Sequence, residues 1–114
     1  PDVIRADNVG AMQTRLVAQG ANIPCTPEAE AALHARGVLV LPDFIANAGG
    51  VICAAVEYHG GSKADALASI TGRIRDNTAA VLDEAARDGG TPRSAAVAQA
   101  GRRVREAMAL RRFR

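Results

Sequence analysis

Residues 15–42 read RLVAQGANIPCTPEAEAALHARGVLVLP, and this stretch decides the fold class. It contains two apolar runs. The first is closed by a glycine, which predicts a strand over 15–22 that ends in a loop. The second, over 38–42, is uninterrupted and is typical of a strand buried on both faces of a sheet.

The segment between the two apolar runs has the end signals of a helix. Thr26 is a suitable N-cap, and Pro27 fits the first helical position. Glu28 and Glu30 suit the positive end of the helix dipole, and Gly37 ends the helix. Strand, helix and strand joined by short turns form a βαβ unit, so the two strands are predicted to be parallel.

The C-terminal part of the chain is predicted to be helical over 47–112. Gly60-Gly61 ends the first of three helices, and Ser62 to Asp65 resembles a capping box for the second. Gly89-Gly90 ends that helix, and Thr91-Pro92 starts the third. One face of the second helix repeats at three- and four-residue spacing: Leu67, Ile70, Ile74, Thr78, Val81 and Ala85.

The composition is that of one globular domain. Of the 114 residues, 48% are hydrophobic and 23% charged, which excludes a disordered or membrane-embedded class. Without a membrane-length apolar run or a signal pattern, we expect a cytoplasmic protein. Cys25 and Cys53 lie in apolar contexts and are predicted to be reduced, buried thiols. The opening Pro1-Asp2, with no initiator Met, indicates a fragment of a longer chain.

Two adjacent glycines, Gly49 and Gly50, fall in the first turn of a predicted helix, where each costs about 1 kcal/mol relative to alanine. In doubly wound sheets, ligands bind outside the carboxyl ends of the strands. The chain has two such ends, Gly20-Ala21-Asn22 and Asn47-Ala48-Gly49-Gly50. Glycine lets a flat ring approach the backbone, and asparagine offers a donor and an acceptor to a carboxamide or a sugar hydroxyl. Close helix–helix packing is an alternative explanation of the glycines.

Two sequence motifs at a matching spacing resemble those of a known family. They are G-A-N followed by T-P-E-A over 20–29, and P-D-x-x-x-N-A-G-G-V over 42–51. With them the chain resembles the Glu/Leu/Phe/Val dehydrogenase family of NAD(P)-dependent amino-acid dehydrogenases, as far as AMALRRF near its C-terminus. The resemblance implies that residues 1–114 are the C-terminal portion of a Rossmann-like dinucleotide-binding domain, with about two parallel strands and several long helices. It also implies oxidative deamination of an L-amino acid, glutamate or an apolar one, to a 2-oxo acid.

The resemblance implies a role for each matching position. The cofactor, NAD or NADP, is expected to contact Gly20, Ala21, Asn22, Asn47, Gly49 and Gly50. The amino-acid substrate is expected to contact Asn47, Val51 and Ala54. Glutamate-specific members typically carry Ser at the position of Ala54, where it binds the side-chain carboxylate, so alanine puts glutamate specificity in doubt.

Parts of the family's machinery are expected to lie outside this chain. Family members take their catalytic Lys and Asp from an N-terminal domain, and no G-x-G-x-x-G pyrophosphate loop occurs here. We therefore expect no catalytic residue in the chain and no activity from the chain alone. The expected partners are the substrate, the nicotinamide cofactor, the rest of the enzyme and further copies in a homo-oligomer.

Other readings of individual residues are simpler. His34, His59 and the two cysteines lack metal-ligand spacing, so we predict no metal site. Asp43 and Glu57 are interpreted as caps or ion-pair partners rather than as acid–base groups.

A nucleic-acid-binding module is the rival hypothesis, because arginines crowd the C-terminal helix. Against it stand a net charge of only +2 and a 3% aromatic content. A non-catalytic assembly module is a third reading, based on the alanine-rich helices. The arginines concerned are Arg102, Arg103, Arg105, Arg111, Arg112 and Arg114.

Overall fold

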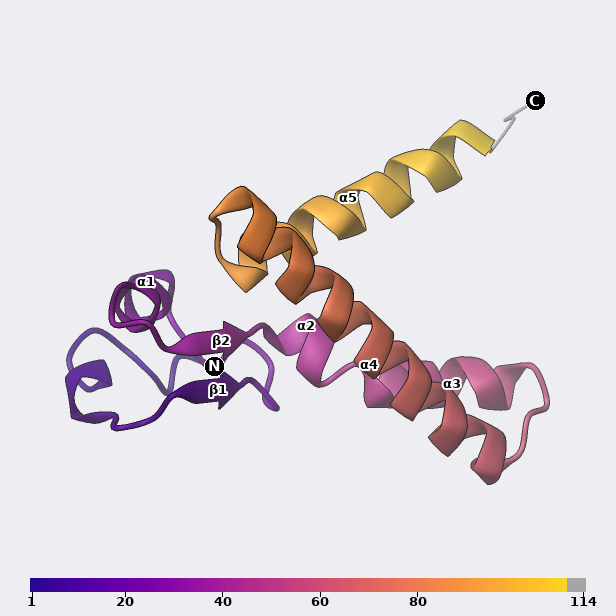
Figure 1. The fold of residues 1–114 in the computed structure, drawn as a ribbon. Helices are drawn as coiled ribbons and strands as arrows, with labels where there is room; N and C mark the ends of the chain where they lie inside the picture. The colour runs from indigo at the N-terminus through magenta and orange to yellow at the C-terminus, as the bar shows by residue number, and fades with distance from the viewer. Residues whose placement is uncertain (111–114) are drawn as a thin grey trace.

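The computed structural model describes residues 1–110. Over these residues it has an α/β fold with two strands, and none of the described helices is both long and apolar enough to cross a membrane. In chain order (Figure 1) the elements are the 3-10 helix η1 (Val9–Ala11), β1 (Leu16–Ala18), α1 (Pro27–Ala35), β2 (Leu39–Leu41), α2 (Asp43–Ala46), α3 (Gly49–Tyr58), α4 (Lys63–Asp88) and α5 (Pro92–Leu110).

β1 and β2 are paired in parallel, and α1 connects them. The register places Leu16 opposite Leu39, and Ala18 opposite Leu41. The predicted βαβ unit is therefore confirmed. Both strands are shorter than the predicted ranges 15–22 and 38–42, because the backbone pairing ends where each strand turns toward the next helix.

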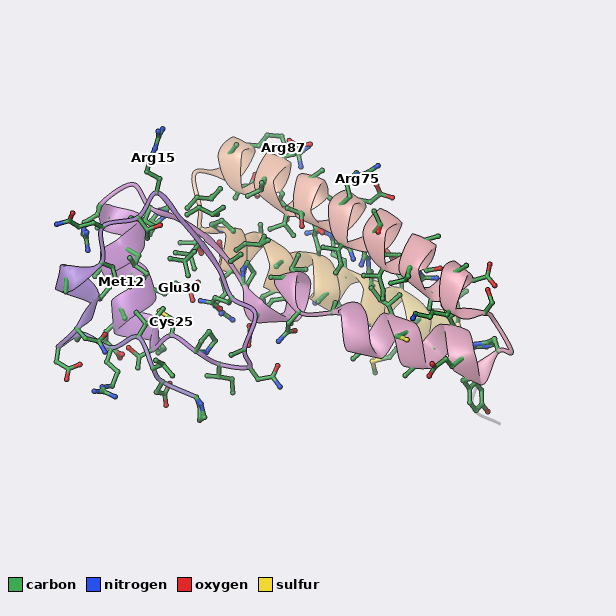
Figure 2. The ribbon with its side chains drawn as sticks, turned by 90° about the horizontal axis from the view of Figure 1, so that it is seen from below. Met12, Arg15, Cys25, Glu30, Arg75 and Arg87 are labelled. Atoms are coloured by element: carbon green, nitrogen blue, oxygen red, sulfur yellow. The ribbon has the colours of Figure 1, made fainter. Side chains whose placement is uncertain are left out.

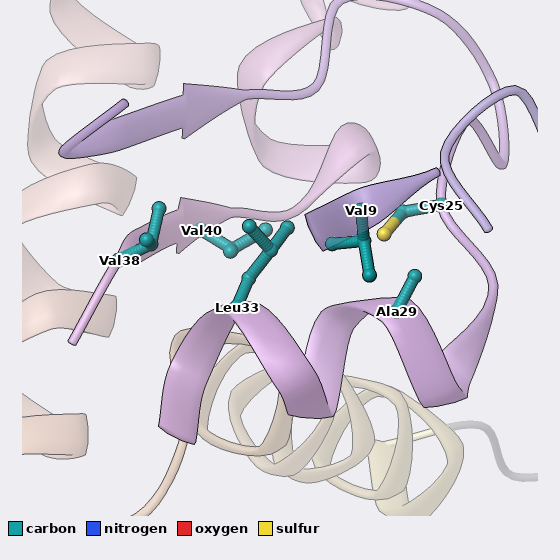
Figure 3. Packing of buried hydrophobic residues seen from close by; sticks show 6 residues of the cluster. All are labelled: Val9, Cys25, Ala29, Leu33, Val38 and Val40. Carbon is teal, nitrogen blue, oxygen red and sulfur yellow. The ribbon is translucent and has the colours of Figure 1, made fainter. Parts of the chain in front are cut away.

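The core of this unit lies between α1 and the sheet. Leu33 and Ala29 of α1 are fully buried and point toward Val9, Cys25, Val38 and Val40 (Figure 3). Small side chains fill the rest of this layer, so one leucine supplies much of the apolar area that α1 removes from water.

The helix ends follow the signals in the sequence. The Thr26 side chain accepts a hydrogen bond from the Ala29 N–H, and Pro27 begins α1. The predicted capping box at Ser62 and Asp65 is present, with both reciprocal bonds formed. The one-turn helix α2 was not predicted. It forms because Pro42 directs the chain out of β2, and the N–H of Asn47 then bonds the carbonyl of Asp43 at 2.8 Å.

The three predicted C-terminal helices are α3, α4 and α5. The long helix α4 runs back along α3 and then contacts the start of α5, which extends away from the sheet (Figure 1). On the predicted face of α4, Val81 and Ala85 are buried against Ala95 and Ala96 of α5. Leu67 of the same face is 56% exposed. α4 packs against α3 at this end, but the buried position there is Ala66, which is 3% exposed, rather than Leu67. Residues 111–112 of the predicted helical region lie outside the described residues.

The Ser62 cap should contribute measurably to stability. We expect Ser62→Ala to lower the free energy of unfolding by about 1 kcal/mol, because the first-turn N–H groups of α4 lose their side-chain acceptor. Urea denaturation measures this directly. Ser69→Ala, within the same helix, is the control and should be neutral or slightly stabilising, since alanine has the higher helix propensity. Equal losses for the two variants would contradict the capping role.

Candidate functional site

Two turns that are far apart in the sequence meet at the carboxyl ends of the strands. Asn22 lies after β1, and Asn47 ends the short helix α2 that follows β2. The side-chain Nδ2 of Asn47 donates a hydrogen bond to Oδ1 of Asn22 at 2.6 Å. The structure therefore brings together the two asparagines that the sequence marked separately, at the edge where ligands of α/β sheets bind.

The asparagine pair keeps unused hydrogen-bonding capacity. Among the described residues, neither Nδ2 of Asn22 nor Oδ1 of Asn47 has a protein partner, and Asn22 is exposed while Asn47 is half-buried. One donor, on Asn22, and one acceptor, on Asn47, thus remain available on the pair. A carboxamide needs this complementary pair, since it carries one carbonyl and one amino group.

Glycine is not required at positions 49 and 50 by the described part of the chain. A Cβ at Gly49 would lie 3.6 Å from Cγ2 of Ile70, an ordinary van der Waals distance, and one at Gly50 would meet nothing within 4 Å. Neither glycine has a positive φ. Close packing between helices therefore does not explain Gly50, and explains Gly49 only weakly. Gly20 is also open, with nothing within 4 Å of a Cβ there.

The two predicted substrate residues lie on the surface of α3, just after the glycines. Val51 is 78% exposed, and Ala54, one helical turn further on, is also exposed. Together they form a small apolar surface on α3. Within the described chain nothing covers this surface.

A largely buried polar network joins the three helices α1, α2 and α5 to Gln19, the residue that follows β1. Nε of Arg93, in the first turn of α5, donates to Glu30 of α1 at 2.8 Å. Nη2 of Arg93 donates to Oε1 of Gln19 at 2.8 Å and to Oδ1 of Asp43 at 3.3 Å. Gln19, Glu30 and Asp43 are 1%, 7% and 8% exposed, whereas the Arg93 side chain is 34% exposed, so the acceptors are buried and the guanidinium reaches the surface. The polar groups of the network hydrogen-bond to one another, since burying them without such partners would cost free energy.

The network also forms one wall of a cavity of about 320 Å³. Figure 2 shows Glu30 and Cys25 within the N-terminal part of the molecule, whereas Arg15, Arg75 and Arg87 point away from it. The asparagine pair, Gly49 and Gly50 do not line this cavity. Its lining residues are Ile23, Cys25, Pro27, Glu30, Ala31, Asp43, Thr91 and Arg93.

The sequence predicted an ion-pair role for only one member of the network. Asp43 was interpreted as a cap or an ion-pair partner, and it is paired with Arg93. Gln19, Glu30 and Arg93 were not recognised as a group. One signal was available: Arg93 lies in the first turn of α5, where the helix dipole disfavours a cation, which indicates a nearby anion.

The pKa of Asp43 is lowered within this network, which makes acid stability testable. Burial alone raises that pKa, but the N–H groups of Ile23 and Phe44 and the charge of Arg93 outweigh it. A carboxyl with a lower pKa in the folded state stabilises the fold above its unfolded pKa, near 3.8, and loses this contribution as the pH falls through the folded value.

We therefore expect the free energy of unfolding to fall as the pH drops below about 4. In Asp43→Asn this dependence should be shallower, because one of the responsible carboxyls is gone. Urea denaturation of both proteins between pH 3 and 6 measures the two slopes. Parallel curves would contradict this role of Asp43.

Cysteine and histidine residues are dispersed. Cys25 is buried, as predicted, and burial raises the pKa of its thiol. Cys53 is only half-buried, contrary to the prediction. Cys53 lies on α3, which buries none of its residues fully. Among residues 1–110, no three His, Cys, Asp or Glu side chains gather into a possible metal site.

Comparison with known proteins gives the class of the chain. The model of the Glutamate/Leucine/Phenylalanine/Valine dehydrogenase family matches residues 1–112. The chain therefore belongs to this family, and the resemblance carried by its two sequence motifs is confirmed.

Individual relatives agree with that assignment. The chain is 56% identical over 57 residues to the NADP(+)-dependent glutamate dehydrogenase of Pyrobaculum calidifontis, a match over 50% of this chain and 14% of that enzyme. It is 38% identical over 87 residues to the glutamate dehydrogenase of Aeropyrum pernix, over 71% of this chain and 21% of that enzyme.

Solved structures share the fold. The L-tryptophan dehydrogenase of Nostoc punctiforme superposes with a TM-score of 0.82 at 25% identity, over 95% of this chain and 32% of that one. The glutamate dehydrogenase of Peptoniphilus asaccharolyticus gives a TM-score of 0.82 at 26% identity, over 96% and 29%. The chain spans less than a third of each of these relatives.

Proposed function

We propose that this chain is the C-terminal part of the NAD(P)-binding domain of an amino-acid dehydrogenase, and that it supplies the nicotinamide end of the cofactor site. The complete enzyme would oxidatively deaminate an L-amino acid to a 2-oxo acid. One observation carries the proposal: the bond between Asn22 and Asn47 at the carboxyl ends of two parallel strands.

The residues around this pair fit a nicotinamide. Its carboxamide matches the donor and the acceptor that the asparagine pair leaves unused. The open surface at Gly50 would allow a flat ring to approach the helix backbone without a Cβ between them. When bound, the nicotinamide accepts the hydride that the reaction removes from the amino acid. The task of this chain is to bind and orient the ring.

The remaining machinery is proposed to come from other parts of the enzyme. The family's catalytic Lys and Asp and its pyrophosphate loop have no counterpart in the two motifs found here. The chain spans 14% of the enzyme from Pyrobaculum calidifontis, which leaves ample length for both. The cytoplasmic location and the homo-oligomer stay predictions.

The substrate is proposed to be glutamate or an apolar amino acid. The relatives include glutamate dehydrogenases, and a structural neighbour is an L-tryptophan dehydrogenase. Val51 and Ala54 would present an apolar wall to the substrate side chain, and Ala54 offers no hydroxyl to a carboxylate.

Replacing Gly50 separates a ligand role from a folding role. In Gly50→Ala the new Cβ meets nothing within the described chain, so α3 should become more stable by about 0.5–1 kcal/mol. In the enzyme that contains this chain, the same methyl group should raise the KM for NAD or NADP several-fold, because it occupies the space proposed for the ring.

Gly72→Ala, within α4, is the matched control. It also gains helix propensity and also meets nothing within 4 Å, but it lies in α4, which contributes no residue to the asparagine pair. It should stabilise the fold and leave the cofactor KM unchanged. A Gly50→Ala enzyme with unchanged cofactor KM would contradict the assignment.

The nucleic-acid alternative gains no support from two of the arginines of α5. Arg102 is paired with Glu84, and Arg103 donates to Asn77, so these two arginines stabilise the contact between α4 and α5. Arg111, Arg112 and Arg114 lie outside the described residues. We therefore retain the dehydrogenase proposal over nucleic-acid binding. The family match over residues 1–112 favours it over an assembly module.

A further inference from the structure

The residue directly after Asn22 has an unusual backbone. Ile23 has a φ of +48°, in the left-handed region that β-branched residues rarely adopt. Its side chain is 61% exposed, so burial of the side chain does not offset the strain. Another interaction must hold this conformation.

Asp43 makes that interaction. Its Oδ2 accepts a hydrogen bond from the Ile23 N–H at 2.8 Å, across 20 positions of sequence. The carbonyl of Asp43 accepts the N–H of Asn47, also at 2.8 Å. Asp43 therefore bonds the residue after Asn22 through its side chain and Asn47 itself through its backbone. The carbonyl of Ile23 is bonded separately, by the N–H of Asp2 at 2.7 Å.

Arg93 in turn fixes Asp43 from the opposite side. It donates to Oδ1 of Asp43, the oxygen that Ile23 does not use. It also bonds Oε1 of Gln19, which accepts the backbone N–H of Asp43 at 3.1 Å. The guanidinium lies 5.6 Å from the centre of the Phe44 ring, which further limits its movement.

We propose that Arg93 is a positioning residue for the cofactor site, acting through Asp43 to hold Ile23 in its left-handed conformation and thereby Asn22 against Asn47. The link to the cofactor rests on the proposed function, whereas the positioning of the asparagine pair does not. Arg93 itself is not among the residues proposed to contact the cofactor.

The first test is made on the 114-residue chain by NMR. In Arg93→Met, amide exchange at Ile23 should become about tenfold faster, since its acceptor is no longer fixed. The side-chain amide signals of Asn22 and Asn47 should shift or broaden. If Arg93→Met does not fold, Arg93→Lys takes its place, because lysine keeps the charge but cannot reproduce the fork that bonds several acceptors.

Arg102→Met is the matched control. Arg102 is also in α5 and also pairs with a largely buried carboxylate, that of Glu84. Neither residue bonds to Asp43, Ile23 or the two asparagines. The control variant should weaken the contact between α4 and α5 without changing the Ile23 or asparagine signals. Unchanged Ile23 exchange and unchanged asparagine signals in a folded Arg93 variant would overturn the proposal.

A second-site change distinguishes positioning from general support of the fold. Asparagine adopts the left-handed region more readily than isoleucine, so Ile23→Asn should reduce the dependence of this turn on Asp43. In a chain that carries Ile23→Asn, adding Arg93→Met should shift the side-chain amide signal of Asn47 less than Arg93→Met does alone. Absence of any such rescue would also overturn the proposal.

The same variants tested in the enzyme that contains this chain separate the two claims. If the asparagine signals change and the cofactor KM rises, both stand. If the signals change but the cofactor KM does not, Arg93 still positions the pair, and the assignment of the pair to the cofactor fails.

Discussion

Leu33→Ala should lower the free energy of unfolding by about 3 kcal/mol, a large share of the stability of a domain of this size. Leu33 is completely buried and lies at the centre of the cluster between α1 and the sheet. Its neighbours include Ala29, Val38 and Val40, which are too short to fill the space that a lost isobutyl group leaves. Most of the cavity should therefore persist.

Leu67→Ala is the control for this prediction. Both leucines are in helices, so the change in helix propensity is the same, but Leu67 is 56% exposed. We expect a cost within about 0.5 kcal/mol for Leu67→Ala. Urea denaturation of the two variants gives the comparison. Similar losses would mean that the layer between α1 and the sheet is not the main core.

Ala54→Ser should shift the specificity of the complete enzyme toward glutamate. A glutamate carboxylate against the wall of Val51 and Ala54 would lose its water without gaining a donor, at a cost of several kcal/mol. A serine hydroxyl would supply one hydrogen bond. We expect the ratio of kcat/KM for glutamate to that for leucine to rise about tenfold, or ~1.4 kcal/mol.

Steady-state kinetics of the parent and the variant with both amino acids measures this ratio. Ala55→Ser is the control, since Ala55 is exposed on the same helix but points about 100° away from Ala54. It should leave the ratio unchanged. A parent enzyme that already strongly prefers glutamate would show that Ala54 does not set specificity, because a lysine elsewhere in the enzyme could bind the carboxylate instead.

Local sequence patterns predicted the elements of this fold well. The first residues of α1 and α4 were predicted from Thr26-Pro27 and from the Ser62 capping box. Such prediction is possible because the capping side chain bonds to a backbone N–H within one helical turn. Gly37, Gly60 and Gly89 all adopt the positive φ that ends a helix. The parallel pairing followed from the order of the elements, since two strands joined by a helix are parallel.

Other features depended on which surfaces meet. The spacing on α4 marked Leu67 and Val81 alike, yet Val81 is buried against α5, whereas Leu67 is exposed next to the buried Ala66. Periodicity identifies a face but not the neighbour that covers it.

The same distinction between local pattern and tertiary contact applies to the candidate site. Glycine and asparagine after an apolar run form a local pattern, so the sequence could mark Asn22, Asn47, Gly49 and Gly50 as candidate cofactor contacts, and their role stays a prediction. Their contact was decided by tertiary structure, since 25 residues separate the two asparagines. The partners within the network of Arg93, Glu30 and Asp43 were likewise decided by tertiary structure, because its charges come from elements up to 63 positions apart. Ion pairs of this kind have no sequence period, and only the packing of α5 against the βαβ unit brings them together.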